Sequence, residues 1–426
     1  MKTGRRQNRL PRRSVPRRDF LRALPSAAAA VGMLGWSDRL ALAAAESSKP
    51  KRACILLWMA GGPSPYETLS PLEDHPNGGG TKAISTRVPG IRIAEYLPQM
   101  AAQMDDLALI RSLTSKEGNH NRASFLWHTG YLPTPTVKYP ALGAVAAAQG
   151  GQTTGALPAF VHIGGKARVR VGGGLLGTQY DPFVHQNPKS PPGNTEPATD
   201  THRYRRRLDL LAQLQAEQNL ATGVNDSHQT IYDKASRMIL SPEMRAFDLA
   251  SENEKVRTAY GDSDFASGCL LARRLIEAGV TFVEVNIRGW DTHQDNFTKT
   301  AQMAEQVDQP TAALIADLKE RGLLDSTLVV WMGEFGRKPK INPRGGRDHF
   351  PRVFSAALAG GGIRGGQVVG RMSRDGSEVA DRPVTVPDLF QTFCQCLKVD
   401  PDAESISSVG RPIKVVEEGK VIQELF

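Results

Sequence analysis

The chain has 426 residues, and its 53 Lys and Arg against 44 Asp and Glu give a formal net charge of +9. Ten of the basic residues and two of the acidic ones fall within residues 1–45, which alone carry a net charge of +8. The remaining chain is therefore close to neutral, so its charge gives no reason to expect a nucleic-acid partner, and we predict none. Its four cysteines have neither disulfide-framework nor zinc-site spacing, and we interpret them as small buried hydrophobic residues.

Residues 1–45 are typical of an export signal. The run RRDFLR at residues 17–22 is a twin-arginine pattern, and an alanine-rich apolar segment after it ends in the small residues of a cleavage site. A basic disordered arm, the alternative, does not explain this order of segments. The apolar segment is too short and too rich in Ala and Gly for a permanent membrane span. We predict a twin-arginine signal peptide, the twin-arginine export machinery as a partner, and a periplasmic or extracellular mature protein.

The mature chain, residues 46–426, is predicted to form a single α/β domain. Its first strand is the apolar run at residues 53–59, which ends in a Gly/Pro turn carrying Ser64 and Glu67. The run at residues 107–113 is a second strand.

After the second strand, a polar cluster that contains His120 and Arg122 opens a helix, and this helix ends at Thr129-Gly130. Free N–H groups and the dipole make a helix N-terminus favourable for anions. A capping cluster without any ligand is the alternative.

The middle of the chain contains fewer chemical groups of interest. Residues 159–163 are predicted to form a strand, and the lone His162 within it is interpreted as a structural residue. Residues 181–200 are rich in Pro, Asn and Ser, and residues 204–260 have charged, helical periodicity. We therefore predict that residues 181–262 form a linker followed by a helical insertion.

The last third of the chain repeats one pattern, in which a strand is followed by polar side chains. The strand at residues 280–287 is followed by Asp291 and His293, and a helix then leads to the strand at residues 327–332. This β-α-β order predicts a mostly parallel sheet, whose carboxyl edge is where such sheets place their ligands.

The stretch at residues 327–349 carries the strongest signal. Its strand is followed by Glu334 and Arg337, and the adjacent pair Asp348 and His349 comes eleven residues after Arg337. Carboxylate oxygens and imidazole nitrogens together suit a zinc-like ion. Taken alone, Glu334 could be a helix cap and Asp348-His349 a surface pair.

The motifs in their order resemble the family called domain of unknown function 1501, over nearly the whole mature chain, and more loosely the alkaline phosphatase / sulfatase superfamily. The matching segments are GGPS at 61–64, NHNRA to TG at 119–130, ARRLIEAGV and GWDTH at 272–293, GEFGR at 333–337 and GGRDH at 345–349. The resemblance implies a doubly wound, mostly parallel sheet flanked by helices, with one or two divalent ions at its edge.

The superfamily pattern implies a nucleophile at the start of the helix that ends in Thr-Gly, and this chain has His120 there. Glu334 stands where an Asp ligand is expected, and Phe335 replaces the His that follows. His120 could be a ligand, a nucleophile or a general acid/base, and we favour the ligand role. The hydroxyls of Ser64 and Ser124 are weaker nucleophile candidates.

We therefore predict an exported metal-dependent hydrolase of phosphate or sulfate esters that acts on a small-molecule or glycan ester. Zinc is the favoured ion, with calcium, magnesium or manganese as alternatives. Arg122 and Arg337 are candidate oxyanion clamps beside His120. The alternatives are a non-catalytic metal- or anion-binding protein and a purely structural exported protein. The predicted metal ligands are Glu67, His120, Asp291, His293, Glu334, Asp348 and His349.

Overall fold

The computed structural model describes residues 52–150, 156–165, 171–195, 197, 199–222 and 226–426. The predicted signal peptide lies outside these residues. A central sheet has eight strands in the order β12-β4-β11-β8-β1-β7-β5-β6. The strands are β1 (Ala53–Ala60), β4 (Leu107–Leu113), β5 (Phe160–Ile163), β6 (Phe183–His185), β7 (Phe282–Arg288), β8 (Thr327–Met332), β11 (Phe354–Ala359) and β12 (Gln367–Val369).

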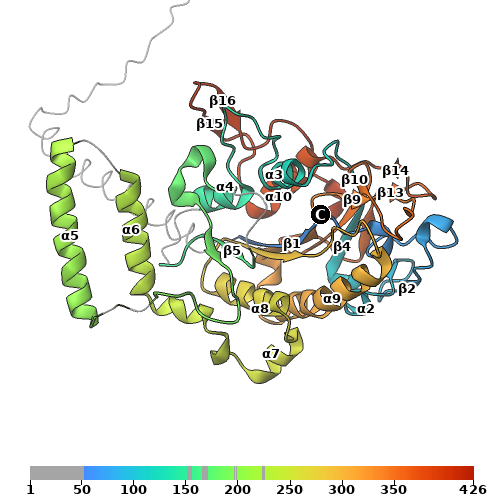
Figure 1. Ribbon diagram of the computed structural model, residues 1–426, viewed down its shortest axis with the longest axis horizontal. Helices are drawn as coiled ribbons and strands as arrows, with labels where there is room; N and C mark the ends of the chain where they lie inside the picture. The colour runs from blue at the N-terminus through green and yellow to red at the C-terminus, as the bar shows by residue number, and fades with distance from the viewer. Residues whose placement is uncertain (1–51, 151–155, 166–170, 196, 198, 223–225) are drawn as a thin grey trace, which may run out of the picture. The chain divides into compact units, whose positions relative to one another are not determined.

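The sheet is parallel except for β11, which runs antiparallel to both of its neighbours, β8 and β4. Helices cover both faces (Figure 1). One face carries α2 (Pro98–Ala102), α8 (Asp264–Glu277) and α9 (Asn296–Glu320), and the other carries α3 (His120–Thr129), α4 (Leu142–Gln149) and α10 (Val386–Leu397). The predicted doubly wound, mostly parallel sheet flanked by helices is confirmed.

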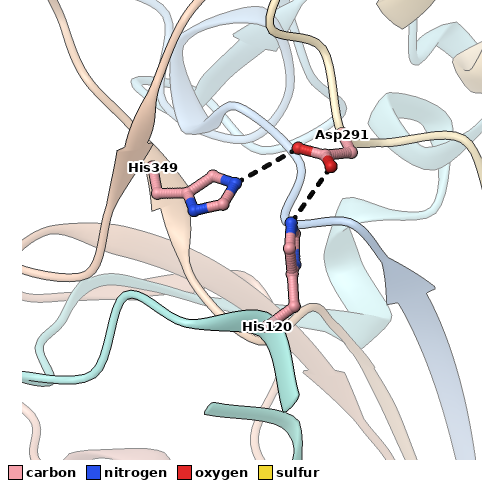
Figure 2. A group of neighbouring side chains, drawn as sticks. All are labelled: His120, Asp291 and His349. Carbon is pink, nitrogen blue, oxygen red and sulfur yellow. Dashed lines mark hydrogen bonds and ion pairs between the residues drawn. The ribbon is translucent and has the colours of Figure 1, made fainter. Parts of the chain in front are cut away.

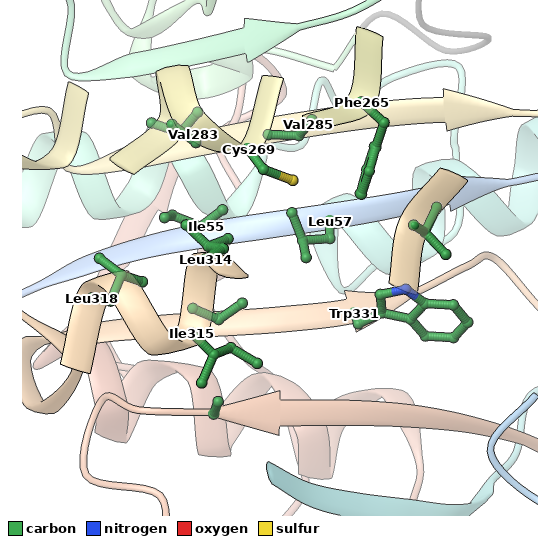
Figure 3. Packing of buried hydrophobic residues seen from close by; sticks show 14 of the residues in the cluster. Ile55, Leu57, Phe265, Cys269, Val283, Val285, Leu314, Ile315, Leu318 and Trp331 are labelled. Atoms are coloured by element: carbon green, nitrogen blue, oxygen red, sulfur yellow. The ribbon is translucent and has the colours of Figure 1, made fainter. Parts of the chain in front are cut away.

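The central strand β1 shows why the sheet is covered on both sides. Successive side chains of a strand point to opposite faces. Ile55 and Leu57 accordingly join the cluster under α8 and α9, while Leu56 and Trp58 join the cluster under α3, α4 and α10. Figure 3 shows Ile55 and Leu57 packed against residues of both helices, among them Cys269 of α8. Because helices cover both faces of the sheet, β1 is buried at every position and can be apolar throughout.

The stretch predicted as linker and helical insertion contains mostly helices, namely α5 (Thr201–Thr222), α6 (Asp226–Ile239) and α7 (Glu254–Tyr260). It begins differently from the prediction, because residues 183–185 form the edge strand β6 beside β5 instead of irregular chain. All four cysteines are buried and free, as predicted. The described residues belong to one compact unit of the chain, Lys51–Phe426.

Among the described residues, four small hairpins lie outside the central sheet. The pair β9–β10 matters most, because it aligns His349 with Arg337 and so joins the motifs at residues 333–337 and 345–349. The hairpins are β2 (Ala83–Ser85) with β3 (Arg92–Ala94), β9 (Gly336–Arg337) with β10 (His349–Phe350), β13 (Arg371–Met372) with β14 (Val379–Asp381), and β15 (Glu404–Ile406) with β16 (Pro412–Lys414).

The strand directions determine where the polar loops meet. The parallel strands β1, β4, β7 and β8 all end at the same edge of the sheet. The antiparallel strand β11 begins at that edge, so the segment before it, which contains His349, lies there too. This edge is where open α/β sheets bind ligands.

We expect Leu57→Ala to lower the free energy of unfolding by about 3–5 kcal/mol, because it leaves a cavity in the packed centre of the sheet. Leu57 has 0 % of its surface exposed, whereas Leu214 on α5 is 54 % exposed. The matched change Leu214→Ala should therefore alter stability by less than about 0.5 kcal/mol. Urea unfolding followed by circular dichroism measures both, and equal losses would contradict the assignment of β1 to the core.

Candidate metal centre

Three side chains from distant parts of the sequence meet at the carboxyl edge of the sheet: His120, Asp291 and His349 (Figure 2). His120 is the first residue of α3, Asp291 follows β7, and His349 is in β10. One potential ligand atom from each lies within 4.8 Å of the others. Nε2 of His120 is 3.1 Å from Oδ2 of Asp291, and Nε2 of His349 is 3.2 Å from Oδ1 of the same carboxylate.

A third imidazole, that of His293, joins this group on its solvent side. Its Nε2 is 3.2 Å from Oδ1 of Asp291 and 3.0 Å from Nε2 of His349. These three atoms therefore form a nearly equilateral triangle. Bonds of about 2.0–2.1 Å to a tetrahedral ion place neighbouring donor atoms about 3.3 Å apart, so the spacing suits ligands of one ion.

The ring of His120 is oriented by Glu334. The Nδ1 of His120 lies 2.6 Å from Oε1 of Glu334, whose two oxygens also accept hydrogen bonds from the backbone N–H of Gly61 at 3.0 and 3.1 Å. Because Glu334 is fully buried and accepts these bonds, the proton of a neutral His120 belongs on Nδ1. Its buried Nε2 finds no hydrogen bond of good geometry among the described residues and points toward Asp291.

The other two imidazoles follow the same rule. The Nδ1 of His349 donates to the carbonyl oxygen of Gly118 at 2.9 Å, and the Nδ1 of His293 faces Oδ1 of Asp348 at 3.3 Å. In each ring the outer nitrogen has an acceptor, which leaves the lone pair on Nε2. Partners of this kind fix the tautomer and direction of metal-binding histidines.

The donor atoms are of the types that a divalent metal ion accepts. One nitrogen each of His120 and His349 and one oxygen of Asp291 lie within 4.8 Å of one another, and the imidazole of His293 lies beside them. Imidazole and carboxylate are ligand types found in zinc sites. Glu334 and Asp348, predicted as ligands, instead contact the outer nitrogens of His120 and His293. Phe335, which replaces an expected histidine, is fully buried and packs its ring against those of His120 and His349, with centroids 4.8 and 4.5 Å apart.

Arg337 holds the carboxylate of Asp291 in place. The guanidinium of Arg337 is fully buried, and its Nη2 donates to Oδ1 of Asp291 at 2.6 Å. Its other hydrogen bonds go to the carbonyl oxygens of Gly61, Gly62, Trp290 and Arg347. A buried guanidinium with these partners positions the carboxylate and does not face a substrate, so the structure does not place Arg337 as an oxyanion clamp.

The loop after β1 can approach Asp291 only because residue 61 is glycine. Gly61 has a φ of +120°, and a Cβ atom there would lie 2.5 Å from the backbone nitrogen of Asp291. Any side chain would thus force the two strand ends apart. The same backbone carries the N–H that Glu334 accepts.

Two further predicted residues lie outside the cluster. The carboxylate of Glu67 is fully buried and forms an ion pair with Arg347, with Nη2 2.6 Å from Oε1, while Asn296 donates to its other oxygen at 2.7 Å. Arg122 is half-exposed and its Nε donates to Glu117 at 2.6 Å. The structure therefore brings together His120, Asp291, His293 and His349, with Glu334 and Asp348 behind them, but not Glu67 or Arg122.

The ionisation of the cluster follows from these contacts. Burial alone would raise the pKa of Asp291, but the imidazoles of His120 and His349 and the guanidinium of Arg337 beside it hold this pKa far below its ordinary value. Burial would likewise lower the pKa of His120, yet the carboxylates of Asp291 and Glu334 raise it. Asp291 is therefore an anion at neutral pH, as a metal ligand must be.

The comparison with protein families settles the wider relationship. The family model described as "Protein of unknown function (DUF1501)" matches residues 51–426. The chain belongs to this family. The family membership predicted from the sequence motifs is thus confirmed. A separate comparison with curated proteins gives no match.

Several solved structures have a distant likeness to this DUF1501 protein. A sulfatase from Pseudoalteromonas sp. has 15% identity and a TM-score of 0.43, over 88% of this chain and 72% of that one. A phosphonate monoester hydrolase of Agrobacterium radiobacter has 12% identity and a TM-score of 0.42, over 88% and 77%. The C-terminal periplasmic domain of EptC from Escherichia coli, solved in complex with Zn, has 10% identity and a TM-score of 0.39, over 84% and 86%.

The sequence pattern did not reveal several residues that shape the site of the DUF1501 protein. The acceptor for His349 is a backbone carbonyl, that of Gly118, and no residue type signals such a role. Arg347 has no predicted role of its own within the motif at residues 345–349, although it is fully buried and pairs with Glu67. Only the burial of Arg347 in the structure shows its need for a carboxylate partner, so the sequence alone carried no signal for this role.

We expect two substitutions to separate stability from metal binding in this protein, because each should change one of these two quantities and not the other. Glu67→Gln should lower the free energy of unfolding by about 3–5 kcal/mol, because it leaves the buried charge of Arg347 without its counter-ion. Its zinc affinity should stay unchanged. His349→Ala removes a partly exposed side chain, so it should weaken zinc binding more than about a hundredfold while changing stability by less than about 1 kcal/mol.

Urea unfolding and zinc titration calorimetry measure these two quantities on the same preparations. A loss of zinc affinity in Glu67→Gln as large as that in His349→Ala would make Glu67 a ligand after all. That result would contradict the assignment of Glu67 to the ion pair with Arg347, outside the candidate metal centre.

Proposed function

We propose that this protein is a zinc-dependent hydrolase of phosphate or sulfate esters, with an ion held by His120, Asp291, His293 and His349. One observation supports this most: three imidazoles have their Nδ1 atoms bonded to acceptors and direct their Nε2 atoms at a single carboxylate. A divalent ion bound in such a site supplies Lewis acidity toward a phosphoryl or sulfuryl oxygen.

The residues of the chain have separate tasks in this proposal. His120, His293 and His349 present lone pairs, and Asp291 supplies the negative charge that balances a cation. Glu334 and Asp348 keep the rings of His120 and His293 in place. The side chains of His293 and Asp291 are 36 % and 33 % exposed, so a substrate reaches the centre from this side.

The ligand role of His120 is better supported than a nucleophilic role. A nucleophilic nitrogen must have its lone pair accessible to the substrate. The Nε2 of His120 is buried and faces the carboxylate of Asp291, and its Nδ1 is bonded to Glu334. The hydroxyls of Ser64 and Ser124 belong to residues that are 1 % and 5 % exposed.

The burial of Ser64 and Ser124 makes their hydroxyls poor nucleophiles, and this favours a second candidate function, a non-catalytic metal-binding protein. No arginine in the cluster is exposed as an anion clamp among the described residues, since Arg337 is fully buried. A protein with this centre would bind a metal ion and an anionic ligand without turnover. One bound ion per chain, together with inactivity on every ester tested, would support this second candidate over the first.

We expect the purified mature protein, loaded in turn with Zn, Mn, Mg or Ca, to hydrolyse aryl phosphates or aryl sulfates, with the highest turnover on zinc. His349→Ala should lower kcat/KM by more than about a hundredfold, because it removes one ion ligand. His202→Ala, at an exposed histidine on α5, is the matched control and should keep full activity. Absence of turnover with every metal, or full activity of His349→Ala, would refute the proposal that the protein is a metal-dependent hydrolase.

We also propose that the protein is exported to the periplasm or beyond by the twin-arginine machinery. The pattern at residues 17–22 supports this. The described part of the chain contains no helix with the length and apolarity to cross a bilayer. Replacing Arg17 and Arg18 with Lys should retain the protein in the cytoplasm, as measured by cell fractionation. Unchanged export of this variant would contradict the route.

A further inference from the structure

A second group of titratable side chains lies inside the protein, between α3 and the sheet. Glu284 of β7 is 3 % exposed, His162 of β5 is 4 % exposed and His128 in the last turn of α3 is 9 % exposed. Oε1 of Glu284 is 3.4 Å from Nε2 of His128 and 3.3 Å from Nδ1 of His162. His162 and Glu284 are paired in register on adjacent strands, so their side chains share one face of the sheet.

The outer nitrogens of both rings already have acceptors. Nδ1 of His128 lies 2.6 Å from the carbonyl oxygen of Ser124, and Nε2 of His162 lies 3.3 Å from that of Gly165. A carbonyl oxygen accepts only from an N–H, so these nitrogens carry protons. In a neutral imidazole the nitrogen that faces Glu284 would then be a lone pair pointing at a carboxylate. The contacts become attractive only when an additional proton is bound in the group.

The electrostatic surroundings agree with this proton count. Burial would raise the pKa of Glu284, but the two histidines hold that pKa well below its ordinary value. Burial would lower the pKa of His128 and of His162, yet Glu284 raises both. The stabilisation from the extra proton is therefore complete below pH 6.5, the ordinary histidine pKa, and is lost as the pH rises through the raised values.

The elements packed around the group contribute few other charges. From β1, the ring of Trp58 packs on that of His128 with centroids 4.4 Å apart. From β7, Arg288 acts on His162 and opposes its protonation, and the two histidines oppose each other. The row Glu284, Asn286 and Arg288 lies on one face of β7 and ends in an exposed residue. The buried Oδ1 of Asn286, the next residue of this row, has no hydrogen-bond partner among the described residues.

The group joins the same two elements that carry the metal centre. Glu284 precedes Asp291 by seven residues along β7 and its loop, and His128 follows His120 by eight residues along α3, about 12 Å of helix. A helix held at both ends has its position fixed. Release of its last turn from β7 leaves its first residue, His120, in place through Glu334, Asp291 and the ring of Phe335 at that end of the helix.

We propose that Glu284, His128 and His162 are positioning residues, which bind a proton and thereby hold α3 so that His120 reaches the metal centre. Metal affinity is thus coupled to the protonation of a group that touches no ligand of the ion. This inference rests on the proposed function for its effect on zinc, whereas the proton-binding group itself stands on the contacts of the three side chains.

The decisive measurement is the zinc dissociation constant of the full chain as a function of pH, for the wild type and Glu284→Gln. We expect Glu284→Gln to bind zinc about tenfold more weakly near pH 6.5, with the difference shrinking as the pH rises through the raised pKa values of His128 and His162, where the wild-type group also loses its proton. His185→Gln is the matched control: His185 is 5 % exposed on β6 and lies outside the group. It should follow the wild-type curve.

A metal-free readout accompanies this titration. The backbone amide resonance of Ala123, a buried residue of α3 that does not titrate, should show an inflection at the pH where His128 titrates, and Glu284→Gln should lack it when both are followed by nuclear magnetic resonance. Should Glu284→Gln fail to fold, His162→Gln takes its place, with the same expected loss of the inflection and a smaller change in affinity.

The outcomes separate the two proposals. A wild type that binds no zinc at any pH overturns the proposed function, while the inflection of the Ala123 resonance still decides the positioning role. A Glu284→Gln affinity loss of equal size at every pH, or a wild-type Ala123 resonance without the inflection, overturns the positioning role. An affinity difference that is confined to the lower pH range supports both.

Discussion

The carboxylate of Asp291 is the point on which the rest of the site depends. It lies at the end of a buried strand, accepts a hydrogen bond from the buried Arg337, and faces the inner nitrogens of three histidines. Arg337 holds it through a guanidinium that also binds the loop carbonyls around it. Since the guanidinium cannot lose its charge at ordinary pH, Asp291 stays ionised and in place whether or not a cation is bound.

The surrounding residues form successive layers around this carboxylate. The three histidines come from different parts of the chain. In each of them, an acceptor bonded to Nδ1 selects the tautomer of the ring. Outside this group of side chains, Glu67 and Arg347 neutralise each other in a buried ion pair. A polar residue near a metal centre therefore need not touch the ion, and its role follows from which nitrogen or carbonyl it contacts.

The fold and the location of the site could be predicted, because both follow from patterns in the sequence. Apolar strands followed by polar turns, with one β-α-β unit, predict a parallel sheet and a shared edge, and Asp291, His293 and His349 do meet there. The role of Glu67 could not be predicted, since a carboxylate near a strand end looks the same whether a metal or a buried arginine neutralises it. The same holds for Arg337, whose burial depends on tertiary packing.

The position of His349, late in the sequence and just before β11, has a consequence for the order in which the site is assembled. Because His349 is residue 349 of 426, it joins the ligand-bearing edge only after most of the polypeptide has been synthesised. A nascent chain shorter than this lacks one imidazole and cannot capture an ion with the complete set. Under the export route predicted from residues 1–45, which carries folded proteins, the choice of metal would fall to the cytoplasm and its supply of ions.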